Sequence, residues 1–144
     1  MRLRFGGKFW LATWACLAIC YGAMLYVLYA PQSLLVFDWC AALGLEVVVS
    51  SLRAQVAAPP PPLYQSIPDG LWVYSSTLLL AIPWVEAKLQ GEAFVWLSIP
   101  IMLALGAEAG QAAGVVQGTF DFKDLMGYVL GGYVAYVQIT RTKQ

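Results

Sequence analysis

Long apolar runs, separated by short polar breaks, dominate this chain. The first covers residues 9–29 and contains no charged side chain. A membrane-spanning helix needs about 20 such residues, whereas a cleaved signal peptide has an apolar core of roughly 7 to 15. The pattern therefore predicts a retained first span at 9–29, and later apolar runs predict further spans at 70–86, 93–111 and 122–140.

The segment 34–56 is apolar but interrupted by polar groups. Asp38, Glu46, Ser50 and Arg53 fall within one arc of a helix, which is an amphipathic pattern. Such a segment could lie in the membrane interface, form a re-entrant hairpin or cross the bilayer as a fifth span. The distribution of basic residues separates these alternatives.

Four spans place most Lys and Arg residues on the side that holds both termini. A fifth span would move Lys88, Arg141 and Lys143 to the opposite side, which the positive-inside rule disfavours. We therefore expect four transmembrane helices plus an interfacial or re-entrant amphipathic segment, in an all-α integral membrane protein. The residues then expected inside are Arg2, Arg4, Lys8, Lys88, Arg141 and Lys143, against Arg53 and Lys123 outside.

Residues 57–69 are predicted to form a proline-rich outer loop. The four consecutive prolines at 59–62 favour a stiff, extended spacer that lacks backbone donors. The Ile-Pro-Asp-Gly sequence at 67–70 is typical of a turn, and Asp69 is expected to cap the helix that follows it.

Glycines recur at every fourth position near the end of the chain. Small residues at this spacing let helix backbones approach closely in lipid. The pattern predicts that the third and fourth spans pack along a glycine seam, formed by Gly106, Gly110, Gly114, Gly118, Gly127 and Gly131.

Acidic and amide groups gather around the predicted outer loop at 112–121. Glu108 and Gln111 share one helix face, where a charged group is expected to face the bundle or a wet cavity. Asp121 and Asp124 resemble a capping box at the start of the fourth span. The simpler interpretations are a headgroup-level position for Glu108 and helix capping for Asp121. The candidate ligand-binding or partner-binding residues are Glu108, Gln111, Gln117, Asp121 and Asp124.

Composition supports a membrane protein and narrows its function. The 144 residues are 60% hydrophobic and 11% charged, against about 25% charged in a soluble domain, which predicts a single membrane domain over 1–144. Eight basic and eight acidic residues cancel, so no basic field attracts nucleic acid. The absence of histidine removes the commonest general base and the usual haem and zinc ligand. We therefore predict no cofactor, no metal and no catalytic residue, and the sequence favours a protein without enzymatic activity over an enzyme.

The order Glu-x-x-Gln, a short glycine-containing loop, Gly-Thr-Phe-Asp-x-x-Asp and a glycine-containing last helix resembles the VanZ-like membrane proteins. The resemblance covers about the last quarter of the chain. It implies a small bacterial inner-membrane protein connected with the cell envelope, since founding members are associated with resistance to the glycopeptide teicoplanin. The residues that carry it are Glu108, Gln111, Gly118, Thr119, Phe120, Asp121, Asp124 and Gly131.

These patterns, together with the resemblance, lead us to expect one of two functions. The first is a non-enzymatic, VanZ-like protein of the bacterial inner (plasma) membrane, with both termini cytoplasmic, that contacts membrane lipids and binds a lipid-linked or cationic ligand at its acidic outer face. The alternative is an accessory or assembly subunit of a larger membrane complex, for example a respiratory or photosynthetic one. In that case the same acids would pair with basic residues of another subunit.

Overall fold

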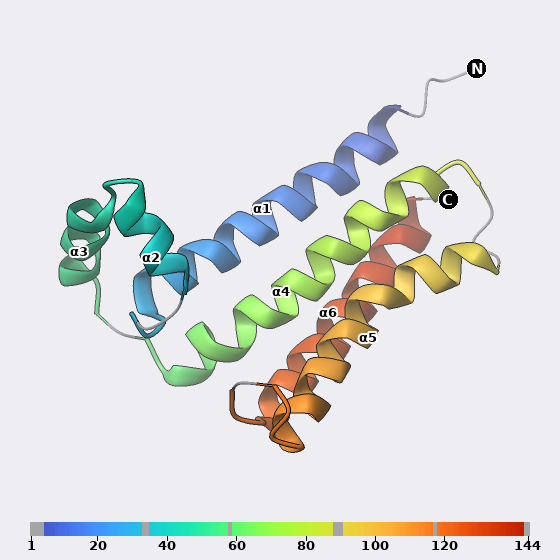
Figure 1. Cartoon of the computed structure of the whole chain (residues 1–144). Helices are drawn as coiled ribbons and strands as arrows, with labels where there is room; N and C mark the ends of the chain where they lie inside the picture. The colour runs from blue at the N-terminus through green and yellow to red at the C-terminus, as the bar shows by residue number, and fades with distance from the viewer. Residues whose placement is uncertain (1–4, 33–34, 58, 88–90, 117, 143–144) are drawn as a thin grey trace.

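The computed structural model describes residues 5–32, 35–57, 59–87, 91–116 and 118–142. Every regular element in these ranges is helical, which confirms the predicted all-α class for the described residues (Figure 1). Two helices, α1 over Gly6–Tyr29 and α5 over Glu92–Ala112, are long and apolar enough to cross a membrane. The helices are α1 (Phe5–Tyr29), α2 (Leu35–Ala42), α3 (Glu46–Gln55), α4 (Pro61–Ala81), the 3-10 turn η1 (Ile82–Trp84), α5 (Glu92–Ala112) and α6 (Phe122–Thr142).

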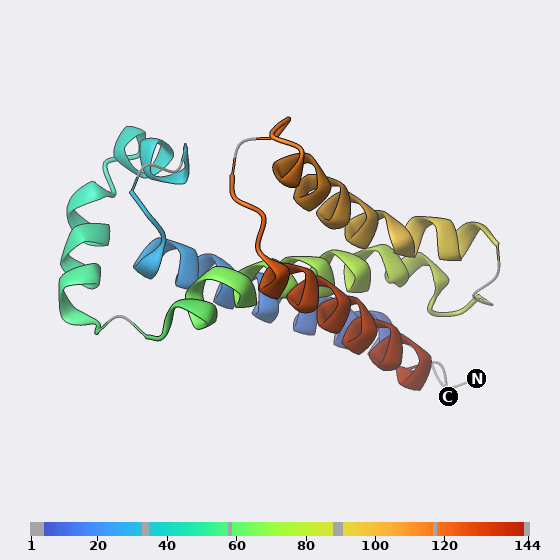
Figure 2. The same cartoon turned by 90° about the horizontal axis from the view of Figure 1, so that it is seen from below.

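Helix α4 lies at the centre of the bundle. Its largest contacts are with α6 and α1, and α5 packs on it less extensively. The start of α1 and the end of α6 lie at the same end of the bundle (Figure 2), which we call the terminal end. Lys8 Nζ pairs there with a Glu86 carboxylate oxygen at 3.2 Å. Of the other basic residues expected on this side, Arg2, Arg4, Lys88 and Lys143 lie outside the described residues.

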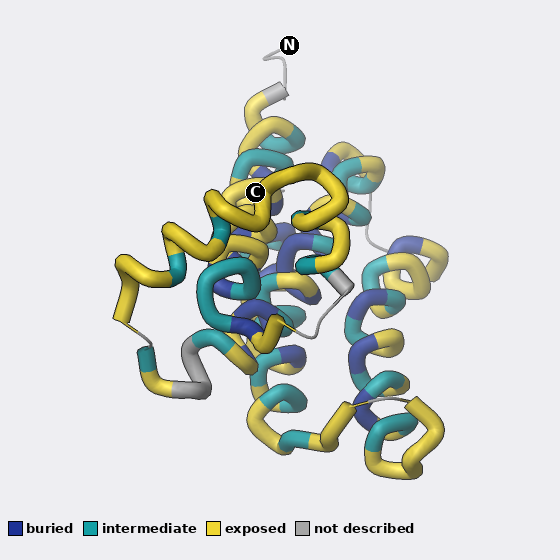
Figure 3. Tube along the Cα trace, turned by 60° about the vertical axis from the view of Figure 1, so that its left-hand side comes forward, coloured by how far each residue is buried: buried dark blue, intermediate teal, exposed yellow. Residues whose placement is uncertain are grey.

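Two groups of buried apolar side chains hold the four long helices together. The larger group joins α1, α4 and α6 through residues such as Leu11, Leu78 and Ile139. The smaller group joins α4, α5 and α6 through Val73 and Ala104. Burial is confined to the inner faces of these helices, and their outer faces expose large apolar side chains (Figure 3). An apolar exterior of this kind suits a lipid environment.

The closest helix crossing brings three glycines together. A Cβ built on Gly70 of α4 would lie 2.8 Å from the carbonyl oxygen of Gly127 on α6, and one built on Gly131 would collide with the carbonyl group of Gly70. Gly127 and Gly131 therefore pack closely as predicted, but against α4. Gly70, which no repeat in the sequence marked, is their partner.

The predicted seam on α5 is wrong. A Cβ on Gly106 would meet no atom of the described residues within 4 Å, and Gly110 faces Val116 of its own loop. Gly114 has φ +70° and ends α5, since its N–H donates to Gln111 and the next N–H donates to Gly110, as in a Schellman motif. Gly110 and Gly114 thus belong to the end of α5, and α6 packs mainly against α4, not α5.

The predicted loop at 57–69 is also wrong, because α4 already begins at Pro61. Proline is tolerated in the first turn of a helix, where its missing N–H would have had no intrahelical partner. Pro68 lies inside the helix, so the sequence at 67–70 forms no turn. Asp69 consequently projects from the body of α4 instead of capping its start.

The amphipathic segment forms two short helices, α2 and α3, separated by Gly44 at φ +71°. They contain 8 and 10 residues, or about 12 and 15 Å of helix, so neither crosses the roughly 30 Å hydrocarbon core alone. Arg53 anchors this α2–α3 arm, because its guanidinium donates to the carbonyl oxygens of Val27 and Ala30 at 2.9 Å each. The arm thereby satisfies backbone acceptors near the end of α1.

Candidate functional site

Glu108 is the best-buried charged side chain of the described residues, with 3% of its surface exposed. The Tyr128 hydroxyl donates to Oε1 at 3.4 Å, and the backbone N–H of Asp121 donates to Oε2 at 3.3 Å. Glu108 thus connects α5, the loop after it and α6. Its side chain faces the interior of the bundle.

Asp121 caps α6, as its position in the sequence indicated. Its Oδ1 accepts the backbone N–H of Lys123 at 2.9 Å. In a capping box, the residue three positions on would accept the N–H of the cap residue. That role belongs to Glu108 here, so the predicted pairing of Asp121 with Asp124 is wrong and Asp124 is left for other contacts.

A third helix contributes Asp69 to the same region. The Tyr26 hydroxyl of α1 donates to Asp69 Oδ1 at 2.9 Å. The charges of Asp124 and Glu108 both act on Asp69, so the three carboxyl groups of α4, α5 and α6 form one electrostatic cluster. We call this the acidic end; it lies opposite the terminal end. Sequence reasoning missed Asp69, Tyr26 and Tyr128, because their roles depend on the helix starting at Pro61 and on which faces meet.

Two buried polar atoms at the acidic end have no hydrogen-bond partner within the described ranges. They are Asp124 Oδ1 and Ser66 Oγ. Ser66 is only 8% exposed and lies at the α4–α6 crossing, where Gly127 packs against its carbonyl oxygen. Buried polar atoms in proteins nearly always form a hydrogen bond, so these two atoms are acceptors that a ligand could use.

No cation neutralises the acidic end among the residues that the structure describes. The one ion pair among the described residues joins Lys8 and Glu86, which lie at the terminal end. Arg53 donates to backbone carbonyls, and no carboxylate of the described residues lies within ion-pair distance of the exposed Lys123 side chain. Nor do the described acids form a group arranged to hold a metal ion. Carboxylates with open acceptor positions can receive a cation that brings its own hydrogen-bond donors.

The predicted glutamines do not join this cluster. A Cβ on Gly118, whose φ is +137°, would lie 2.6 Å from the Gln111 amide nitrogen, so that side chain packs against the loop. It forms no hydrogen bond with Glu108 within the described ranges. Gln117 lies outside the described residues.

The molecule is thus a helical bundle with membrane character and a buried, uncompensated acidic end. No family model matches the chain, and no curated protein or solved structure is significantly similar to it. The resemblance to VanZ-like proteins stays a prediction carried by its motif residues.

Proposed function

We propose that this protein crosses the membrane four times, through α1, α4, α5 and α6. Helices α4 and α6 each contain 21 residues, the same as α5, and are therefore about 31 Å long. All four pack in one bundle around α4, so a bilayer crossed by α1 and α5 would also contain the other two. The length of the helices matches a hydrocarbon core of about 30 Å.

The proposed orientation places the terminal end in the cytoplasm of a bacterial cell. Lys8 and Arg141 lie at that end, whereas Arg53 and Lys123 lie at the other. The positive-inside rule supports this side for the termini once the basic residues outside the described ranges are counted with them. The VanZ-like motif residues support a role in the inner membrane and the cell envelope.

Within this frame, the protein binds an amine-bearing headgroup or lipid-linked precursor at its acidic end. One observation carries the proposal: Glu108 is almost fully enclosed, is held by two donors, and has no basic partner among the described side chains. A charged residue within a membrane costs about 2.5 to 3.5 kcal/mol at the centre of a helix, and a partner of opposite charge offsets that cost.

An ammonium group fits the remaining contacts. It has three donors and no acceptor, so it can bridge carboxylates from several helices at once. The unpaired Asp124 Oδ1 offers a charged acceptor, and Ser66 Oγ offers a neutral one. Hydrogen bonds between ionised partners are roughly twice as strong as neutral ones, which favours a protonated amine over a neutral headgroup.

A pair of matched lipids tests the proposal. Native mass spectrometry would measure retention of dioleoylphosphatidylethanolamine and of its N-acetyl derivative, which lacks the positive charge. We expect the wild-type protein to prefer the free amine by about tenfold, or 1.4 kcal/mol, and Glu108→Gln to lose the preference.

Glu92→Gln is the matched control, because it makes the same change at the other end of α5, on an exposed residue. It should bind like the wild type. Equal retention of the two lipids by the wild-type protein, or an unchanged preference in Glu108→Gln with its helical circular dichroism intact, would overturn the proposal.

The second candidate is an accessory subunit of a larger membrane complex. It is favoured by the α2–α3 arm, which exposes large apolar side chains such as Trp39, Leu43 and Val47 at 60%, 73% and 74%. In this case the acids would receive Lys or Arg side chains from a neighbouring subunit. Gentle purification decides between the two: stoichiometric co-purification of fixed partners supports the subunit, and a chain that travels alone supports the ligand-binding protein.

A further inference from the structure

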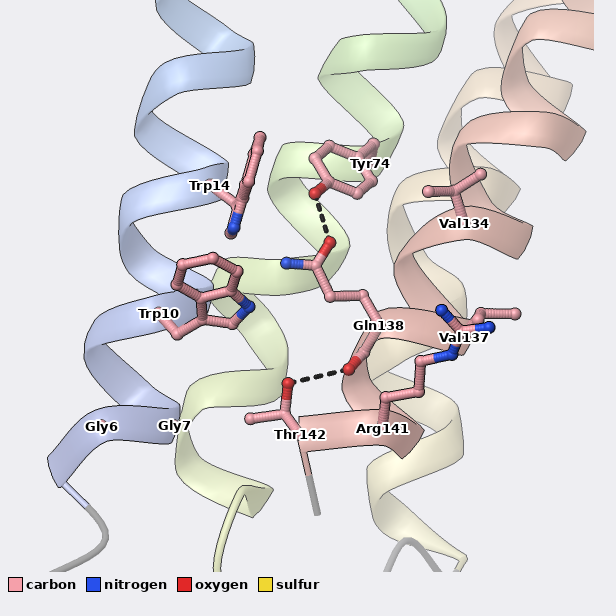
Figure 4. Close-up of a pocket in the computed structure, with 10 residues that line it drawn as sticks. All are labelled: Gly6, Gly7, Trp10, Trp14, Tyr74, Val134, Val137, Gln138, Arg141 and Thr142. Carbon is pink, nitrogen blue, oxygen red and sulfur yellow. Dashed lines mark hydrogen bonds between the residues drawn. The ribbon is translucent and has the colours of Figure 1, made fainter. Parts of the chain in front are cut away.

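A groove runs along α6. At the terminal end it lies between α6, α1 and α4, and beyond that end it lies between α6 and α4. At the terminal end it forms a cavity of about 550 Å³, lined by Trp10 and Trp14 of α1, Tyr74 of α4 and Arg141 of α6 (Figure 4). A second cavity of about 470 Å³ continues toward the acidic end and is lined by Ser66, Lys123 and the helix-crossing glycines. Tyr74 and Val134 line both cavities, so the cavities adjoin at these residues, and together they are here called the α6 groove.

The wall of the α6 groove is apolar over most of its length. Met126, Leu130, Val134 and Val137 line it in turn along one face of α6. This stripe begins at Lys123 and ends at Arg141, which are 18 positions apart, or about 27 Å of helix. The two cations are thus separated by about the thickness of a hydrocarbon core, as headgroup contacts on opposite faces of a bilayer would be.

The terminal end of the groove combines a free cation with aromatic walls. Among the described residues, no carboxylate lies within ion-pair distance of Arg141. Trp10 and Trp14 pack edge to face, with ring centroids 5.4 Å apart, and stand opposite Gln138, whose Oε1 accepts the Tyr74 hydroxyl (Figure 4). Arginine binds phosphate through parallel hydrogen bonds, and tryptophan prefers the level of lipid headgroups.

We propose that the α6 groove holds an acyl chain of an anionic phospholipid and that Arg141 binds its phosphate. The phosphate site at Arg141 lies at the terminal end, away from the acidic end, and the inference does not rest on the amine-binding function. Arg141 is preferred over Lys123 as the phosphate ligand, because Lys123 is flanked in sequence by Asp121 and Asp124, whose charges oppose binding of an anion. The apolar stripe then contacts the acyl chain of the lipid, and the positive charge of Arg141 complements the negative charge of its phosphate.

Two lipids with the same chains test the headgroup contact. Native mass spectrometry of the full-length protein would compare retention of dioleoylphosphatidylglycerol with that of dioleoylphosphatidylcholine. We expect the wild type to retain the anionic lipid about tenfold better and Arg141→Gln to lose this preference. Lys8→Gln removes a positive charge at the same end, from a residue that pairs with Glu86 and does not line the groove, and should leave the preference unchanged.

Blocking the groove tests the acyl chain. Val134 lies where the two cavities meet, and Val134→Trp should fill the depression and reduce phosphatidylglycerol retention several-fold. Val129→Trp is the matched control, because Val129 is exposed on α6 and lines neither cavity of the groove.

Three outcomes would overturn the inference: equal retention of the two lipids by the wild type, wild-type retention by Val134→Trp, or displacement of the lipid by free glycerol phosphate at equal concentration. The last would mean that Arg141 binds a soluble anion. Glu108→Gln should retain phosphatidylglycerol like the wild type, so failure of the amine-binding function and failure of the groove are distinguishable.

Discussion

The glycine crossing of α4 and α6 allows the bundle's packing to be tested with a single methyl group. In Gly131→Ala, the added Cβ would collide with the carbonyl oxygen of Gly70 and lie 3.0 Å from its carbonyl carbon. Both atoms belong to the backbone, so no side-chain rotation can relieve the contact. The two helices, which make the most extensive contact of the described helix pairs, would have to move apart at this crossing.

The magnitude follows from two opposing terms. Extra volume in a well-packed interior costs about 1 to 3 kcal/mol, whereas replacing glycine by alanine inside a helix gains about 0.5 to 1 kcal/mol. Because the opposing atoms cannot yield, we expect the steric term to dominate and Gly131→Ala to lose about 1 to 2 kcal/mol of unfolding free energy.

Gly106→Ala is the matched comparison on α5. Its Cβ would meet nothing within 4 Å, so only the helix-propensity term applies and the variant should gain about 0.5 to 1 kcal/mol. The assay is reversible unfolding in mixed micelles, followed by far-ultraviolet circular dichroism and extrapolated to zero denaturant. If Gly131→Ala proved as stable as Gly106→Ala, the close crossing of α4 and α6 would be refuted.

Three further changes probe contacts outside the crossing. Arg53→Ala should speed hydrogen exchange in α3 about tenfold or more, because hydrogen bonds to charged groups contribute about 1.5 to 3 kcal/mol each. Gln55→Ala is the control, since it removes only a hydrogen bond within α3 and should leave the exchange rate unchanged. Equal effects of the two substitutions would mean that Arg53 does not anchor the α2–α3 arm. Tyr26→Phe removes the donor to Asp69 and should lower unfolding free energy by about 1 kcal/mol, measured in the same micelle assay; no loss would contradict this contact. A double-mutant cycle on Lys8 and Glu86, whose side chains are about half exposed, should give a coupling free energy of about 0.2 to 1 kcal/mol that falls with added salt. A larger coupling free energy that does not depend on salt would mean that the pair is shielded from solvent.

The helical class and the approximate positions of the long helices could be predicted because they depend on local pattern. The apolar runs at 9–29, 93–111 and 122–140 lie within α1, α5 and α6. The start of α4 could not be predicted in the same way, since prolines at 59–62 suit both an extended spacer and a helix beginning. Because α4 begins at Pro61, Asp69 lies inside the helix and belongs to the acidic end, whereas the sequence predicted that it would cap the helix.

The candidate site was predictable in part for the same reason. Asp121 caps α6 through a bond to an amide two residues away, which is a local contact that sequence order indicates. Glu108 was expected to face inward because exposing a charge to lipid is costly. Its actual partners, Tyr128 and the Asp121 amide, are 20 and 13 positions away and depend on how α5 meets α6.

The sequence by itself therefore determined where α1, α5 and α6 lie, where α6 is capped and that Glu108 requires shelter, because these properties follow from hydrophobicity and from neighbours along the chain. Only the tertiary structure decided that Gly127 and Gly131 pack on Gly70, that Asp69 and Tyr26 join Glu108, and that a groove follows α6. These features arise where faces of different helices meet. Glycine spacing predicts that another helix can pack closely, but it does not identify that helix.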